Sequence, residues 1–229
     1  MLAGAMDVMA DELCAGLVIS PLGQAGNGVC EDARITHIHG NHPVPGEDSL
    51  EAGRQLLDFI GQLPAECHLL FLVSGGTSSL LEVPAEGVGL ADLQAVNRWL
   101  LGSGLDIVQM NRVRTALSQI KGGQLHRFLG GREYTVLLLS DVPGDDAGII
   151  GSGLLHPALS TQPLPDGLPG WVSQLAERQR PGVSGARAAD CHIIGTNRAA
   201  LDAIVAHARQ EGIHAVIQDE PLTGDAEVM

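Results

Sequence analysis

The amino-acid sequence predicts an α/β protein with a mostly parallel sheet. Short β-like runs alternate along the chain with segments of helical periodicity, which is the pattern of strand–helix–strand units. Two of these runs, residues 69–73 and 134–142, are apolar without alternation, as expected of strands that helices cover on both faces. The 30 glycines and an aromatic share of only 3% fit tight strand–helix turns better than a sandwich packed by aromatic side chains.

The first expected elements follow from apolar spacing and from turn residues. Residues 3–13 have apolar side chains at helical spacing with no capping residue in front, so they resemble the end of a helix. Two short β-like runs, 16–20 and 34–38, are joined by a loop rich in glycine and asparagine.

The middle of the chain is expected to contain three helices around the run at 69–73. The segment HPVP predicts an extended turn, because proline disfavours helical backbone in the residue before it. After this turn, Asp48 or Ser49 is expected to cap a helix that continues to about Leu63. Apolar spacing predicts two further helices, over residues 90–101 and 107–117.

The last third of the chain is expected to alternate again after a long loop. A loop-rich stretch from 159 to 189 contains one expected helix, near residues 170–179. A strand over 192–196, a helix over 197–212 that Gly212 ends, and a strand over 214–218 follow.

Charge and cysteine usage exclude several classes of partner and compartment. The 13 basic and 27 acidic residues give a net charge of −14, whereas nucleic acid and anionic membranes need a basic footprint. No apolar run approaches the roughly 18 residues of a membrane span. Acidic residues near the start do not fit a signal peptide, and the four cysteines show no CxxC spacing. We therefore expect a cytoplasmic protein that binds neither nucleic acid nor membrane.

Polar or glycine-rich segments follow three of the expected strands: SGGTSS, SDVPGDD and GTNR. Ligands of parallel sheets bind beyond the carboxyl ends of the strands, and glycine lets backbone N–H groups approach an anion. Neither a Walker A loop nor G-x-G-x-x-G is present. On spacing alone, Gly75 and Gly76 therefore fit phosphate binding and a tight turn capped by Ser74 or Thr77 equally well.

Three further groups can carry chemistry, and each has a plainer alternative. Asp141, Asp145 and Asp146 can hold Mg²⁺ together with phosphate oxygens, or one of the last two caps the next helix. A cationic face forms if the helix after residue 107 extends far enough, although a solvated face is the usual explanation; its members are Arg114, Ser118 and Lys121. Three histidines are interpreted as structural rather than as metal ligands: His37, His39 and His42.

Several motifs, taken in order, resemble one known family. They are HPVP, LVSGGTSSLL, LLGSGLDIVQMNRVRTALSQIKGGQL, LLLSDVPGDD with IGSG, and IIGTNRAALDA. This ordered set resembles the glycerate 2-kinases linked to the MOFRL domain, some of which carry the label hydroxypyruvate reductase. The resemblance implies ATP- and Mg²⁺-dependent phosphorylation of D-glycerate at its 2-hydroxyl, which gives 2-phosphoglycerate. It also implies a Rossmann-like three-layer first domain, a smaller second domain and an active site in the cleft between them.

The resemblance also implies roles for individual residues. The nucleotide or phosphate pocket would be lined by Ser74, Gly75, Gly76, Thr77 and Ser78, and completed by Gly195 and Asn197. The substrate and the transferring phosphoryl group would face Asn111, Arg114 and Lys121, and the metal would lie near Asp141 and Asp145. Such a set suits phosphoryl transfer, which relies on positioning and on cations that offset negative charge.

Three departures from the family pattern are as informative as the matches. The family begins with a central strand and a Gly-Lys-Ala motif whose lysine is thought to act in catalysis, and Met1 aligns with that lysine. Residues 219–229 resemble the start of the linker to the second domain, so residues 1–218 would be the first domain without its first strand. SGLLHP stands where the family has Ser-Gly-Pro-Thr.

We therefore interpret the chain as a weakly active or inactive piece of a glycerate kinase. Its expected partners are D-glycerate and the absent C-terminal domain of the same protein, and a homodimer is left open. The alternative is a non-catalytic nucleotide- or phosphate-binding module. A nicotinamide-dependent reductase is the weakest option, because the dinucleotide fingerprint is missing.

Overall fold

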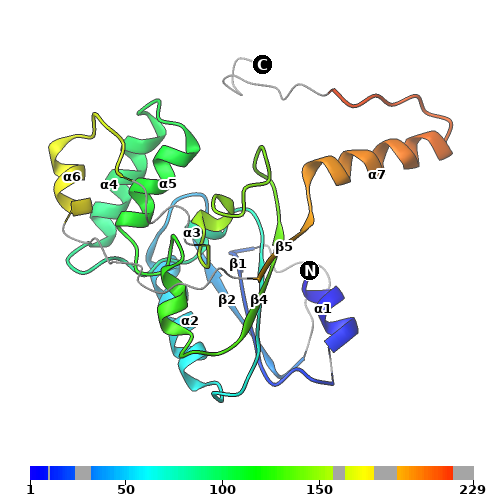
Figure 1. The fold of residues 1–229 in the computed structure, drawn as a ribbon, viewed down its shortest axis with the longest axis horizontal. Helices are drawn as coiled ribbons and strands as arrows, with labels where there is room; N and C mark the ends of the chain where they lie inside the picture. The colour runs from blue at the N-terminus through cyan, green and yellow to red at the C-terminus, as the bar shows by residue number, and fades with distance from the viewer. Residues whose placement is uncertain (10, 24–31, 157–162, 178–189, 219–229) are drawn as a thin grey trace. The chain divides into compact units, whose positions relative to one another are not determined.

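The computed structural model describes residues 1–9, 11–23, 32–156, 163–177 and 190–218. The expected linker at 219–229 and much of the loop-rich stretch at 159–189 lie outside these ranges. The chain forms two compact units, Met1–Ile194 and Gly195–Met229, of which the first contains most of the fold (Figure 1).

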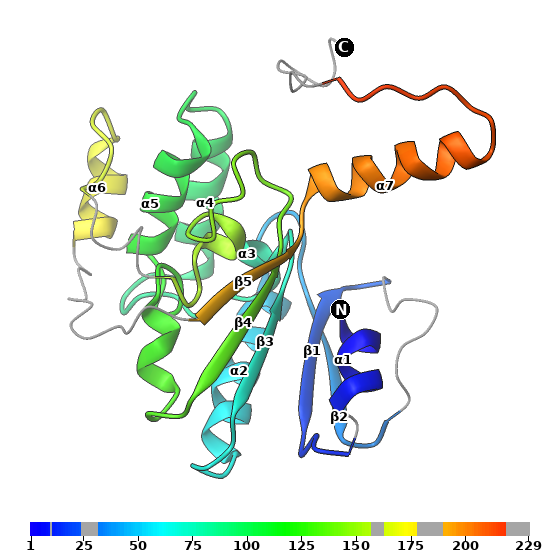
Figure 2. The ribbon, with the colours of Figure 1, turned by 45° about the vertical axis from the view of Figure 1, so that its right-hand side comes forward.

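Five strands form two sheets within the described residues. The first sheet pairs β1 (Gly16–Pro21) with β2 (Ile35–Gly40) in parallel. The second has the order β3-β4-β5, from Leu69–Val73, Tyr134–Leu139 and Asp190–Gly195, and β3 and β4 are parallel. Figure 2 shows both sheets with helices around them, which confirms the α/β class and the parallel pairing.

The main core lies between the strands and the helix α2 (Glu47–Gln62). Ala52 and Ile60 of α2 pack with Val73 of β3 and with Val136 and Leu138 of β4. Half-buried Ile19 and Ile38, from the first sheet, extend the same cluster. One hydrophobic core therefore serves both sheets.

A second core lies among the helices α4 (Leu90–Leu101), α5 (Ile107–Ala116) and α6 (Gly170–Glu177), which Figures 1 and 2 both draw together. Its centre contains Val96, Val113 and Val172, one from each helix. The remaining helical elements are α1 (Leu2–Met9), α3 (Thr77–Leu80), α7 (Asn197–Gln210) and two 3₁₀ segments, η1 (Gln124–Phe128) and η2 (Ile150–Ser152). No helix in the described ranges combines the length and the apolar character that a membrane span needs.

The capping residue predicted for α2 is wrong, although the helix itself is confirmed. Gly46 is the N-cap residue, so α2 begins at Glu47. The Ser49 hydroxyl accepts a hydrogen bond from the Gly46 N–H at 3.1 Å, and Asp48 accepts one from the Asn41 side chain at 2.9 Å. Ser49 thus satisfies the backbone of the residue that precedes the helix rather than acting as the N-cap itself.

Two other expectations are wrong. The helix after residue 107 ends at Ala116, and the Ser118 hydroxyl then accepts hydrogen bonds from the N–H groups of Ile120 and Lys121 at 3.3 and 3.2 Å. This turn removes Ser118 and Lys121 from the helical face expected to include Arg114. The segment 214–218 was expected to be a strand, but these residues pair with no strand of the described chain.

Candidate functional site

The loops that follow β3 and β4 lie side by side. These strands are parallel neighbours, with Val73 opposite Leu138, so their carboxyl ends meet at one edge of the sheet. A Cβ built on Gly75 would lie 1.9 Å from the Asp141 Oδ2 atom, closer than any side chain allows. A side chain at position 75 would therefore require the Asp141 carboxylate or the loop to move.

The SGGTSS loop is a tight turn whose centre is Gly76. Gly76 has a φ of 80° and is the N-cap residue of the short helix α3, without a side-chain capping bond. The Thr77 hydroxyl donates to the Ser74 carbonyl at 2.6 Å, and the Ser79 hydroxyl donates to the Gly76 carbonyl at 3.0 Å. The expected cap by Ser74 or Thr77 is thus wrong, because Thr77 closes the turn instead. Ser74 and Gly75 stay exposed at its surface.

The acidic residues after β4 divide between structural and open positions. Asp146 accepts a hydrogen bond from the Gly148 N–H at 2.8 Å, in the turn that leads to η2. Asp145 has a φ of 50°, and Asp141 is exposed beside Gly75. Within the described ranges no three His, Cys, Asp or Glu residues gather as a metal centre. The position of Asp141 fits a Mg²⁺ ion held by one or two carboxylates and by phosphate oxygens.

His42 lies over the same turn. Its Nε2 atom is 3.0 Å from the position that a Cβ on Gly76 would occupy. A side chain at position 76 would crowd the His42 ring and would be strained by the positive φ of Gly76. His42 was expected to be structural, and its place beside the turn gives it contact with the candidate site.

Arg114 is held by two asparagines. Its Nε donates to the Asn97 Oδ1 at 3.1 Å, and its Nη1 donates to the Asn111 Oδ1 at 3.3 Å. Asn97 is fixed in turn by its own bond to the Leu93 carbonyl at 3.0 Å, and Ser152 donates to Asn111 at 3.2 Å. Burial lowers the pKa of Arg114, and the negative charge of nearby Glu82 acts in the opposite direction. The guanidinium is nevertheless charged at any physiological pH.

Lys121 forms a buried ion pair with Glu82. Both side chains are only 2% exposed, and the Lys121 Nζ atom contacts the Glu82 Oε2 atom. The other carboxylate oxygen, Oε1, accepts from the Ser118 hydroxyl at 2.6 Å and from the Val83 N–H at 3.0 Å. The expected catalytic cation is therefore already bound to a carboxylate. Glu82 was not among the predicted site residues, since its segment LLEVP carries no pattern that points to residue 121.

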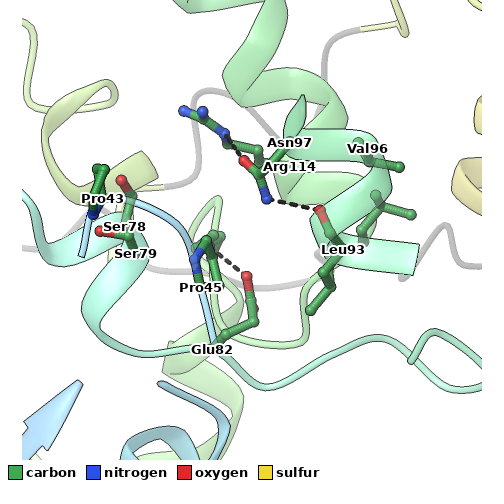
Figure 3. Close-up of a pocket in the computed structure, with 11 residues that line it drawn as sticks. Pro43, Pro45, Ser78, Ser79, Glu82, Leu93, Val96, Asn97 and Arg114 are labelled. Atoms are coloured by element: carbon green, nitrogen blue, oxygen red, sulfur yellow. Dashed lines mark hydrogen bonds and ion pairs between the residues drawn. The ribbon is translucent and has the colours of Figure 1, made fainter. Parts of the chain in front are cut away.

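These side chains surround a small pocket of about 20 Å³. Figure 3 shows Pro43, Ser78 and Ser79 on one side and Asn97 with Arg114 on the other. The complete lining is Pro43, Pro45, Ser78, Ser79, Glu82, Leu93, Val96, Asn97, Arg114, Leu117 and Lys121. This volume suits one or two water-sized groups rather than a whole sugar acid. The pocket is thus a subsite that joins the SGGTSS loop to Arg114.

Gly195 and Asn197 belong to the second unit. Gly195 ends β5, and Asn197 is the first residue of α7. Thr196 between them is the N-cap residue, and its hydroxyl accepts from the Ala199 N–H at 3.1 Å. The start of α7 is therefore a regular capped helix terminus.

Comparison with known proteins connects this site to a family. Residues 1–164 match the family described as "Domain of unknown function (DUF4147)". A protein of Agrobacterium vitis named as a hydroxypyruvate reductase is 36% identical over 98% of this chain and 60% of its own length. The D-glycerate 2-kinase of Thermotoga maritima is 38% identical over 70% of this chain and 38% of its own length.

A solved structure supports the same grouping. The crystal structure of a glycerate kinase from Thermotoga maritima superimposes with a TM-score of 0.72 and 28% sequence identity. The match covers 91% of this chain and 51% of that one. The chain thus spans between about two fifths and three fifths of the lengths of these relatives.

Proposed function

The chain belongs to the DUF4147 family, and from this membership we propose that it contributes the first domain of a glycerate 2-kinase. The proposed reaction transfers the terminal phosphoryl group of ATP to the 2-hydroxyl of D-glycerate and gives 2-phosphoglycerate. Residues 1–218 are this domain in the proposal, and residues 219–229 begin the linker to a second domain of the same protein. The proposed location is the cytoplasm, since Cys14, Cys67 and Cys191 are free thiols.

One observation carries the proposal: the contact between Gly75 and Asp141 places a glycine-rich turn beside an open carboxylate. In the proposal, residues Ser74, Gly75, Gly76, Thr77 and Ser78 bind the nucleotide phosphates. Asp141 and Asp145 hold the Mg²⁺ ion, which offsets charge on the phosphate oxygens when it is bound.

The substrate side of the proposal rests on α5 and the turn after it. Arg114 provides positive charge in the pocket, and Asn111 holds Arg114 while it contacts Ser152. Lys121 lines the pocket, where its Nζ atom pairs with Glu82, and it faces the substrate in the proposal. Positioning and electrostatic stabilisation of this kind supply most of the rate enhancement in phosphoryl transfer.

The test is an assay of ADP release that depends on D-glycerate, with phosphorus NMR to identify the product. It is run on the 229 residues and on the product of the whole reading frame that contains them. We expect 2-phosphoglycerate from the longer product and little or none from the 229 residues, because these span only part of the relatives. Lack of activity in the longer product would overturn the proposed reaction, and robust activity of the 229 residues would overturn the expected need for a second domain.

The pairing of Lys121 with Glu82 favours a second candidate, a nucleotide- or phosphate-binding module without catalysis. Such a module binds ATP through the SGGTSS turn, and D-glycerate has no effect on its stability. Thermal-shift measurements with ATP, with D-glycerate and with both distinguish the two functions. The substitution Gly76→Asp should abolish the shift by ATP in either case, since it places a side chain against His42 at a positive φ.

A further inference from the structure

We propose that Arg114 binds the carboxylate group of the hydroxy-acid substrate, and that Asn97 is the positioning residue that holds Arg114 for this contact. The inference rests on the proposed function and assigns one part of the substrate to one side of the pocket. It adds a residue, Asn97, that neither the sequence motifs nor the proposed reaction involves.

The charge of Arg114 is not balanced by a carboxylate. Within the described ranges no acidic side chain forms an ion pair with it, and its side-chain partners are the amide oxygens of Asn97 and Asn111. The nearby acid, Glu82, uses one oxygen for Lys121 and the other for Ser118 and the Val83 N–H. A half-buried guanidinium with neutral partners attracts an anionic ligand, because the loss of hydration is otherwise poorly offset.

The hydrogen bonds of Arg114 leave one edge of its guanidinium available. The Nε–H group donates to Asn97, and one N–H of Nη1 donates to Asn111. The edge formed by Nη1 and Nη2 therefore keeps N–H donors for a ligand. Figure 3 shows the terminal nitrogens directed away from Asn97, toward the side of the pocket where Pro43 and Ser78 lie. Two parallel N–H donors match the two oxygens of a planar carboxylate.

The size and the walls of the pocket favour a carboxylate over a phosphoryl group. Its volume of about 20 Å³ has room for the two oxygens of a carboxylate in place of ordered water. Ser78 and Ser79 line the pocket opposite Arg114, at the end of the loop that is proposed to bind phosphate. A substrate held by its carboxylate at Arg114 therefore keeps its hydroxyl on the side of the SGGTSS loop.

Asn97 is suited to position Arg114 because its amide is itself fixed. The Nδ2 atom donates to the Leu93 carbonyl one helical turn earlier, which leaves Oδ1 to face the guanidinium. Exchange of Asn97 for aspartate keeps an oxygen at this place but adds a negative charge. Aspartate also lacks the Nδ2 donor to the Leu93 carbonyl, and its negative charge neutralises Arg114 before any substrate binds.

The experiment measures D-glycerate binding by calorimetry for the wild-type chain and for N97D, R114M and R98M. We expect millimolar affinity for D-glycerate in the wild type and in R98M, which changes an exposed arginine on the same helix as Asn97. N97D and R114M should bind at least about tenfold more weakly, while glycerol, which lacks the carboxylate, should not bind to any of them. Circular dichroism confirms that each variant is folded.

Several outcomes would overturn the inference. Wild-type affinity in folded N97D would mean that Asn97 has only a structural role. Unchanged affinity in R114M, or no binding of D-glycerate to the wild type, would remove the carboxylate contact. Inorganic phosphate that binds more tightly than D-glycerate and depends on Arg114 would assign this residue to the phosphoryl group instead. ADP release is assayed separately. Binding of D-glycerate that depends on Arg114, without kinase activity, would support the inference and overturn the proposed function.

Discussion

Glu82 and Lys121 form an ion pair in the interior, where an unpaired charge is costly. Each side chain is 2% exposed, and Glu82 also accepts from Ser118 and from the Val83 N–H. Because all of these donors converge on one carboxylate, the pair fixes the segment after α3 to the turn after α5. The loop that contains Ser78 and the helix that contains Arg114 are thereby connected.

The substitution Lys121→Met should destabilise the protein strongly, since it leaves the Glu82 carboxylate buried without its partner. We expect a loss of about 3–5 kcal/mol in the free energy of unfolding, measured by urea denaturation. The double variant Lys121→Met with Glu82→Leu removes both charges and should recover much of this loss. A loss below about 1 kcal/mol in the single variant, in the range of a surface pair, would contradict the burial of the pair.

The substitution Gly75→Ala should weaken ATP binding without unfolding the protein. Its Cβ would lie 1.9 Å from the Asp141 Oδ2 atom, so the loop or the carboxylate must move. We expect an affinity for ATP that is lower by about tenfold or more, measured by calorimetry. Gly61→Ala is the matched control, because a Cβ there meets no atom within 4 Å. It should leave ATP binding unchanged and stabilise α2 by about 0.5–1 kcal/mol.

The start of α5 determines where Asn111 and Arg114 lie. Asp106 is the N-cap residue, and its carboxylate accepts from the Gln109 N–H at 2.8 Å. Gln109 accepts in return from the Asp106 N–H at 3.1 Å, which completes a reciprocal pair of capping bonds.

Asp106→Ala should therefore lower the free energy of unfolding by about 1 kcal/mol, since two N–H groups lose their acceptors or their orientation. Asp106→Asn retains an oxygen acceptor and should cost much less. Chemical denaturation of the two variants provides the measurement. Equal stability of the alanine variant and the wild type would show that the cap contributes nothing to α5.

The exposed ion pair of Glu51 with Arg54 on α2 should make the free energy of unfolding depend on pH in the acidic range. The Arg54 side chain lowers the pKa of Glu51 to about 2, and Gln55 adds to this effect. Because the folded pKa lies below the ordinary 4.5, the bonds of the Glu51 carboxylate stabilise the fold above that pH and are lost as the pH falls toward 2. An NMR titration of the Glu51 carboxyl carbon should give a midpoint near 2 in the wild type.

Arg54→Gln should return this midpoint toward 4.5, while Arg98→Gln on α4 should leave it unchanged. A wild-type midpoint close to 4.5 would show that the bonds to Arg54 do not persist in solution.

Local patterns predicted the elements better than their ends. The helix over 90–101 was predicted with its observed bounds, because its apolar spacing is regular and glycines flank it. The end of α5 was missed because the Ser118 hydroxyl, and not a glycine or proline, redirects the chain. Residues 214–218 have the composition of a strand, but a strand also needs a neighbour to pair with, which composition does not specify.

At the scale of the whole molecule, the site combines predictable and unpredictable contacts. The meeting of Gly75 and Asp141 follows from two parallel strands that end at the same edge, so strand patterns were sufficient to place both loops near a ligand. The pairing of Glu82 with Lys121 joins residues 39 positions apart, and no periodicity in the sequence encodes it. Likewise, Asn97 lies on a different helix from Arg114, so only the packing of α4 against α5 reveals their contact.

The division of the strands into two sheets has a consequence for amide hydrogen exchange. The N–H group of Gly16 bonds toward β2 and that of Leu69 bonds toward β4. The N–H groups of the alternate residues in β1 and β3 therefore point to the opposite side of each strand. Among the described residues, the N–H groups of Leu17, Ile19, Leu70 and Leu72 find no backbone acceptor on that side. These four should exchange with deuterium much faster than their neighbours in the same strand, in a period-two pattern. A chain segment that pairs with the open edge of β1 or of β3 would slow the exchange of the N–H groups on that edge. The exchange rates of these four groups therefore report the addition of a strand.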